Sequence, residues 1–312
     1  MRMLFLRRFV GLNGGVLKTF DYLQHARASG LVSPRMMFFP PRPWDRRLQD
    51  FVSSEDVVTE PGDPDIVLLS REWDEADSVG LTDGKRPILH LVQHAAHGVA
   101  NTAENASLSR PATRIVVASG LADGLRQFNP NGRVVVIEAG VDVGRAPQPW
   151  ASRRWDVTIA GYKSRAIAQE VGALLTKSGR VVNTLTSTIP RRSYLDAVAS
   201  SRVLVALPFQ TGEAAYLAAL EAMHLDVALV TPDSGGPRNY CVDQVSCITP
   251  RYEAADIARC TDELLANPEL LAGIRAGGSA VAARLTLAEE RRRFVDLLGE
   301  LITPHAAAGT GR

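Results

Sequence analysis

Residues 202–232 read RVLVALPFQTGEAAYLAALEAMHLDVALVTP, and they indicate the fold of this chain more clearly than any other stretch. An apolar run at 202–208 is followed by an Ala- and Leu-rich segment typical of a helix, and a second apolar run ends the stretch. Two short buried strands separated by a helix are the repeating unit of parallel α/β sheets. The stretch therefore predicts one such unit.

The same alternation runs through the whole chain and predicts an α/β fold with two doubly wound domains that face a cleft. In such sheets ligands bind at the carboxyl ends of the strands. The strands are expected at 3–9, 35–40, 65–70, 87–93, 114–119 and 133–140, and then at 156–161, 179–185, 202–208, 227–232 and 246–250. Residues 141–155, rich in Gly, Pro and basic side chains, are the best linker candidate.

This pattern divides the chain into a domain over residues 1–148 and a second over 149–312, with the last helix a candidate to pack back on the first. The composition is that of an ordinary soluble α/β protein: 46% of the 312 residues are hydrophobic and 22% are charged. A net charge of +1 provides no general attraction for nucleic acid. The opening apolar run is too short for a signal segment or a membrane helix, so we expect a cytoplasmic protein.

Three cysteines, Cys241, Cys247 and Cys260, lack Cys-x-x-Cys spacing. Their number and spacing argue against both a disulfide framework and a zinc site, and favour reduced thiols. Asp63-Pro64-Asp65 matches the Asp-x-Asp pattern of metal-binding transferases, but its central proline precedes an expected strand. We interpret it as a turn and expect no metal site.

Glu213 and Glu221 are the two most informative residues. Seven residues separate them, the first lying just before the expected helix and the second on it. A carboxylate is seldom buried among apolar residues unless it has partners. The pair therefore suggests a ligand rich in hydroxyl groups.

Two further segments follow strands in the second half. Gly161, Lys163 and Arg165 come directly after the strand at 156–161, where two cations and a helix N-terminus suit a diphosphate, although a pair of solvated side chains is the alternative. Ser234, Gly235 and Gly236 follow the strand at 227–232. That loop can bring backbone amides to a ligand, but a tight turn explains it almost as well.

In the first half, Gly11, Gly14 and Gly15 lie where a strand turns into a helix, which suits either phosphate contact or plain turn chemistry. Lys18 and Asp21, one turn further on, are expected to face the cleft or solvent.

His90, His94 and His97 do not form a metal site in this interpretation, because a strand followed by a loop would splay them. His94 is favoured narrowly over His97 as a hydrogen-bonding residue in the cleft, and His90 as a structural residue.

Several segments together resemble the retaining, nucleotide-sugar-dependent glycosyltransferases of the GT-B architecture that carry a Glu-x7-Glu motif, the family 4 or group 1 type. The resemblance lies in NGGVLKTFDYL, VVASGLADGL and VVVIEAGVD, and is most specific over residues 189–240. Three positions depart from the family pattern. Glu213-Ala214-Ala215-Tyr216 replaces Glu-Gly-Phe-Gly, Tyr162 replaces an arginine, and Glu138-Ala139 replaces Pro-Asn. These changes bear on the specificity for the donor sugar.

The resemblance implies a metal-independent hexosyltransferase without a cofactor, in which Glu221 binds the donor ribose and Glu213 the transferred sugar. It also implies that Lys163 and Arg165 neutralise the diphosphate, while His94 and the glycine loops contribute to the site. A nucleotide-sugar epimerase, a phosphorylase and a catalytically degenerate sugar- or nucleotide-binding protein are the alternatives. The resemblance does not select the acceptor, for which a glycan, a lipid-linked sugar, a protein and a small molecule are the alternatives. Two alternatives apply to Arg7, Arg8, Arg46 and Arg47, which are expected either to contact a membrane surface or to be solvated.

Overall fold

The computed structural model describes residues 1–9, 11, 13–41, 44, 48–49 and 51–303, and the chain divides into two compact units. The first unit comprises Met1–Val117, Ala122–Glu138 and the chain from Leu287 on. The second comprises Ala118–Leu121 and Ala139–Thr286, and all of its residues are described. Residues 141–155, the linker suggested by the sequence, thus lie within the second unit.

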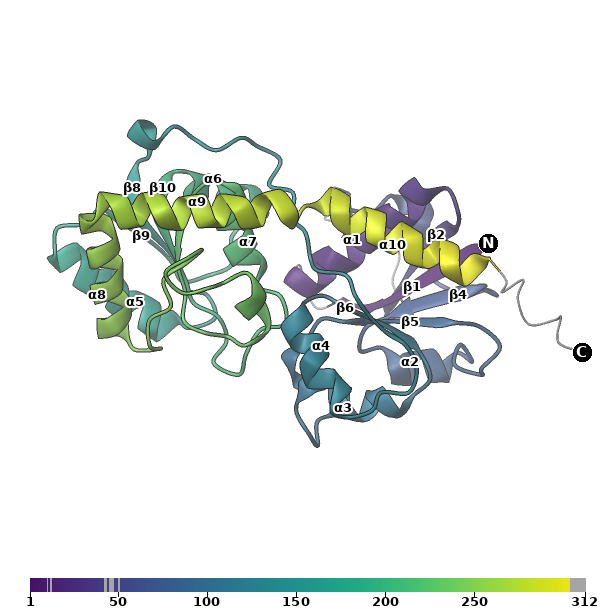
Figure 1. Ribbon diagram of the computed structural model, residues 1–312. Coiled ribbons are helices and arrows are strands. Elements are labelled where there is room, and N and C mark those ends of the chain that lie inside the picture. The colour runs from purple at the N-terminus through teal and green to yellow at the C-terminus, as the bar shows by residue number, and fades with distance from the viewer. Residues whose placement is uncertain (10, 12, 42–43, 45–47, 50, 304–312) are drawn as a thin grey trace, which may run out of the picture. The chain divides into compact units, whose positions relative to one another are not determined.

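A parallel sheet forms the centre of the first unit (Figure 1). Among the described residues it has seven strands in the order β3-β2-β1-β4-β5-β6-β7. These are β1 (Arg2–Arg8), β2 (Ser33–Phe39), β3 (Val57–Val58), β4 (Ile66–Leu69), β5 (Ile88–Val92), β6 (Thr113–Val116) and β7 (Val134–Val136). The six strands expected here are confirmed. The sequence analysis missed β3, because two residues are too few to produce a periodic signal.

The helices of this part of the chain are α1 (Gly14–Ser29), α2 (Trp73–Ser78), α3 (Ala103–Ala106), α4 (Ser119–Arg126) and α10 (Leu287–Ile302). Helix α1 begins where the Asn13 side chain accepts a hydrogen bond from the Val16 amide at 3.0 Å. It ends at Gly30, whose φ of 66° is a left-handed conformation that favours glycine. These two caps set the beginning and the end of the helix.

Helix α10 packs on α1 (Figure 1), and a buried ion pair joins the two helices. Lys18 Nζ lies 2.6 Å from Glu290 Oε2 and 2.8 Å from Asp21 Oδ2. Burial alone would lower the pKa of Lys18, but the two carboxylates outweigh it and the pKa is raised. The expectation that Lys18 faces a cleft or solvent is therefore wrong, because its ammonium group is enclosed between two helices of one unit.

The sheet of the second unit has four parallel strands in the order β11-β10-β8-β9. They are β8 (Trp155–Ala160), β9 (Val182–Leu185), β10 (Ser201–Ala206) and β11 (Ala228–Val230). The fifth strand expected at 246–250 is wrong, since only an isolated bridge joins Ile248 to Val230. A turn uses the neighbouring backbone groups instead, as the Gln244 amide donates to the Cys247 carbonyl at 2.8 Å.

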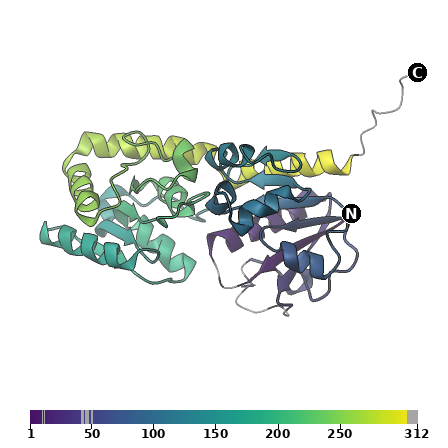
Figure 2. The same ribbon diagram turned by 90° about the horizontal axis from the view of Figure 1, so that it is seen from below.

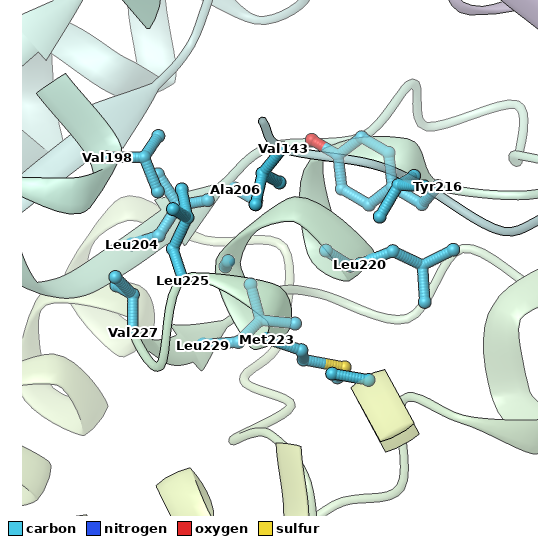
Figure 3. Packing of buried hydrophobic residues seen from close by; sticks show 14 of the residues in the cluster. Val143, Val198, Leu204, Ala206, Tyr216, Leu220, Met223, Leu225, Val227 and Leu229 are labelled. Carbon is cyan, nitrogen blue, oxygen red and sulfur yellow. The ribbon is translucent and has the colours of Figure 1, made fainter. Parts of the chain in front are cut away.

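Helices cover both faces of this sheet, as Figures 1 and 2 show. One face packs against α6 (Arg191–Ala199) and α7 (Leu217–His224), and the other against α5 (Arg165–Lys177) and α8 (Ala254–Ala266). Helix α9 (Pro268–Arg284) contributes residues to both clusters. Figure 3 shows part of the first cluster, with Leu220 and Met223 of α7 among the buried residues. This packing fixes α7, the helix that carries Glu221.

The ion pair between α1 and α10 predicts a large effect of a single neutral substitution. Glu290→Gln should lower the free energy of unfolding by about 3 kcal/mol, because it leaves the Lys18 charge buried with less compensation. Glu300→Gln on the same helix removes an exposed ion pair with Arg133 and should change stability by less than about 1 kcal/mol. Urea unfolding followed by circular dichroism measures both. Equal destabilisation by the two substitutions would contradict the role given to Glu290.

Candidate active site

Three neighbouring strands of the second unit end at one edge of its sheet. Because β11, β10 and β8 are adjacent and parallel, their carboxyl ends lie on the same side. The loop after β8 carries Lys163, the loop after β10 carries Glu213, and the loop after β11 carries Ser234. The fold therefore brings together three segments that the sequence analysis selected separately.

Lys163 and Glu213 form an ion pair across two of these loops. Lys163 Nζ lies 2.5 Å from Glu213 Oε1, and their side chains are 11% and 13% exposed. The same oxygen accepts a hydrogen bond of 3.1 Å from the Phe209 amide. Charged groups this far removed from water need such partners. Without ligand, the cation and the carboxylate neutralise each other.

Aromatic rings surround the ammonium group of Lys163. Its Nζ lies 4.7 Å from the ring centre of Phe209, 4.9 Å from that of Tyr216 and 5.7 Å from that of Tyr162. Such distances give favourable cation–π interactions. Tyr216 is buried, whereas Phe209 and Tyr162 are about half exposed, so part of this aromatic surface faces solvent. The sequence analysis noted Tyr162 only as a departure from the family pattern and did not select Phe209.

The backbone of Glu213 is held against the loop that follows β11. The Glu213 amide donates to the Ser234 carbonyl at 2.9 Å, and the Gly236 amide donates to the Glu213 carbonyl at 3.1 Å. A Cβ atom on Gly236 would lie 2.2 Å from the Ala214 oxygen and 2.3 Å from the Glu213 oxygen. Gly236 is therefore required for this close approach, which holds the backbone of Glu213 in place. Gly235 adopts a φ of 85° in the same turn.

Glu221 lies on α7 with its side chain 4% exposed, and it forms an ion pair with Arg191, the first residue of α6. Partial burial raises the pKa of Tyr162 to about 12, and both Glu213 and Glu221 add to the shift. The Tyr162 hydroxyl thus senses both carboxylates. Burial, reinforced by Glu221, likewise raises the pKa of Tyr194 well above its usual value. The sequence analysis missed Arg191 and Tyr194, because they precede Glu221 by 30 and 27 positions.

Gly161, Arg165 and Ser234, which the sequence analysis also selected, lie in the second unit. Gly161 follows β8, and a Cβ atom there would lie 2.0 Å from Ala168 Cβ, so close packing of α5 requires glycine. Arg165 is exposed, and its Nε donates to the Thr186 carbonyl at 3.0 Å. Ser234 is buried and contributes its carbonyl oxygen to the contact with Glu213.

His94, Gly14 and Gly15 belong to the first unit. His94 is exposed after β5, and its Nδ1 accepts from the Ala96 amide at 3.2 Å. Gly14 and Gly15 are the first two residues of α1. Their contribution to a donor site remains a proposal. His90 is fully buried, which agrees with the structural role expected of it. His97 is also buried, and this burial lowers its pKa to about 4.

Neither a metal-binding cluster nor a membrane-spanning helix occurs among the described residues. Among them, no group of three or more His, Cys, Asp or Glu side chains is placed to hold a metal ion. Asp63-Pro64-Asp65 leads into β4 without the turn expected from the sequence, and Asp65 Oδ2 accepts a hydrogen bond from the Arg2 amide at 2.6 Å. Across the same residues, no helix has the length and apolarity needed to cross a bilayer.

The arginines considered for membrane contact behave differently from one another. Arg7 is buried beside Glu72, with 3.7 Å between Nη1 and Oε1, so the expectation that it lies at a membrane interface is wrong. Arg8 forms an ion pair with Glu75. Arg46 and Arg47 lie outside the described residues.

Comparison with known proteins supports the fold independently of sequence. No protein-family model and no curated protein matches the chain. HepE from Anabaena, solved in complex with UDP-glucose, superposes with a TM-score of 0.72 at 13% identity, covering 96% of this chain and 100% of that one. Sucrose-phosphate synthase from Thermosynechococcus elongatus gives a TM-score of 0.73 at 12% identity, covering 96% and 98%.

A glycosyltransferase from Rickettsia africae is similar to the same extent, with a TM-score of 0.73 at 10% identity over 97% of this chain and 99% of that one. These proteins have two Rossmann-like domains. This chain has the GT-B fold. The fold class expected from the sequence is thereby confirmed over nearly the whole chain.

The contact between Gly236 and the Glu213 backbone predicts that even one methyl group is disruptive. Gly236→Ala should lower the free energy of unfolding by about 2 kcal/mol, because two carbonyl oxygens occupy the space of the new Cβ. Gly273→Ala is the matched control, since Gly273 lies inside α9 with no atom within 4 Å of a new Cβ. It should stabilise the protein by up to about 1 kcal/mol. Thermal unfolding checks both, and an unchanged Gly236→Ala variant would contradict the close approach.

Proposed function

We propose that this protein is a retaining glycosyltransferase that transfers a hexose from a nucleoside-diphosphate sugar to a hydroxyl-bearing acceptor without a metal ion. The observation that carries the proposal is the largely buried ion pair between Lys163 and Glu213 at the carboxyl ends of β8 and β10. Glu221, eight positions after Glu213, adds a second carboxylate whose charge, like that of Glu213, raises the pKa of Tyr162. The GT-B fold supports this function, and its structural neighbour HepE was solved with UDP-glucose.

In this proposal the donor diphosphate draws Lys163 away from Glu213. Negative charge grows on the diphosphate as the bond to the sugar breaks, so a fixed cation stabilises the transition state more than the ground state. The surrounding aromatic rings exclude water from Lys163, which strengthens its interaction with that charge. Arg165 completes the diphosphate site, while the turn at residues 234–236, whose Gly236 amide is bonded to the Glu213 carbonyl, holds Glu213 beside it.

Glu213, once released from Lys163, accepts hydrogen bonds from hydroxyl groups of the transferred sugar. Glu221 binds the ribose hydroxyls of the nucleotide. In a retaining transfer, the acceptor oxygen bonds to the anomeric carbon on the face that the diphosphate leaves, and the acceptor proton departs with the diphosphate.

A catalytically degenerate sugar- or nucleotide-binding protein is the second candidate. It is favoured by the sequence Ala214-Ala215-Tyr216, which replaces the glycines of the family pattern beside Glu213. The Tyr216 ring packs within 4.9 Å of Lys163 Nζ, so this change alters the surroundings of the site's cation directly. Such a protein would bind nucleotide sugars without releasing nucleoside diphosphate.

A panel of UDP-, GDP- and dTDP-hexoses with mixed sugar acceptors tests the proposed function. We expect nucleoside diphosphate to be released from at least one donor, and release to persist in excess EDTA because Lys163 and Arg165 supply the positive charge. NMR of the product should show the anomeric configuration of the donor. Binding without release would favour the degenerate protein, activity that needs added manganese or magnesium would contradict metal independence, and an inverted product would contradict retention.

The ion pair itself predicts opposite effects of its two partners on nucleoside diphosphate binding. Lys163→Met should weaken binding by about tenfold or more, because a charged contact to the diphosphate is lost. Glu213→Gln should tighten binding severalfold while lowering kcat, because the carboxylate no longer competes for Lys163.

Calorimetric titration measures both affinities, and Lys177→Met, an exposed lysine at the end of α5, is the control that should bind normally. Weaker binding by Glu213→Gln would mean that this carboxylate holds the nucleotide rather than competing with it.

A further inference from the structure

We propose that Arg191 is a positioning residue that holds the Glu221 carboxylate oriented for two adjacent hydroxyl groups of a ribose. This inference rests on the proposed function, in which Glu221 contacts the ribose. It adds a residue from another helix, α6, which the sequence analysis did not select.

The contact joins the buried carboxylate of Glu221 to the more exposed guanidinium of Arg191. Arg191 Nη1 donates to Glu221 Oε1, and the two side chains are 32% and 4% exposed. Arg191 begins α6 directly after Pro190, and its Nη2 lies 3.5 Å from the Asp142 carbonyl oxygen. The guanidinium is thus held by two partners, the Glu221 carboxylate and the Asp142 carbonyl.

The chemistry of a buried carboxylate explains why this neighbour affects ligand binding. A buried carboxylate is costly unless a cation or hydrogen-bond donors compensate it. Hydrogen bonds to charged groups are about twice as strong as those between neutral groups, so a well-placed carboxylate is a strong acceptor for hydroxyl groups. The guanidinium also limits rotation of the carboxylate, which is what a pair of neighbouring hydroxyls requires for simultaneous contact. Arg191 therefore acts on the ribose through Glu221.

A purely structural role would be to join α6 to α7. That role predicts lower stability on loss of Arg191, together with an equal loss of affinity for every nucleotide. The positioning role predicts instead that the lost affinity depends on the ribose hydroxyls. Removing those hydroxyls from the ligand and the guanidinium from the protein therefore separates the two roles.

The experiment compares UDP with 2′,3′-dideoxy-UDP by calorimetry on the wild-type chain and on Arg191→Met. The wild type should prefer UDP by about tenfold or more. In Arg191→Met this preference should fall below about threefold, while binding of dideoxy-UDP changes little. Arg191→Lys should restore part of the preference, since it returns a charge but not the fork geometry of arginine. Arg192→Met, an exposed neighbour on the same helix, should keep the wild-type preference.

Each outcome decides one question. If UDP binds the wild type and Arg191→Met keeps the full preference, or weakens both ligands equally, the positioning role is overturned while the proposed function stands. If the wild type binds neither UDP nor GDP nor dTDP, the proposed function fails, and this inference with it. Circular dichroism reports whether Arg191→Met folds, and Arg191→Gln serves for the same comparison if it does not.

Discussion

The ion pair between Lys163 and Glu213 is the interaction on which the organisation of the second unit's strand ends depends. It joins the loops after β8 and β10, and it lies among three aromatic rings that leave each side chain only slightly exposed. Two opposite charges in such surroundings stabilise each other, and removing either partner leaves the other poorly solvated. A dianionic ligand that enters this region has to replace Glu213 as the partner of Lys163.

Backbone packing makes this arrangement specific. The turn at Gly235 and Gly236 lies against the backbone of Glu213, with no room for a Cβ atom on Gly236. The position of the carboxylate is therefore fixed by three adjacent parallel strands and not by one loop alone. Glu221 is held in a comparable way by α7 and by Arg191 of α6. The two carboxylates share the principle that each is paired with a cation from a different segment before any ligand binds.

The sequence predicted the local features well. The apolar runs located ten of the eleven strands among the described residues, and the positions of Lys163 after a strand, Glu213 before a helix and Glu221 on that helix agree with the structure. Pairings between distant residues could not be predicted in this way. Lys163 and Glu213 are 50 positions apart, and Lys18 and Glu290 are 272 apart, so neither pair produces a local pattern. The expected fifth strand failed for a related reason, because hydrophobicity at 246–250 cannot show that a turn has already used the neighbouring backbone groups.

A crystal structure of the protein with bound UDP tests the central claim most directly. The account predicts that Lys163 Nζ contacts a diphosphate oxygen at about 2.8 Å and no longer contacts Glu213 Oε1. The carboxylate of Glu213 should then be open toward the position of the sugar. A structure in which UDP is bound while the ion pair between Lys163 and Glu213 remains intact, with the diphosphate held elsewhere, would contradict the account.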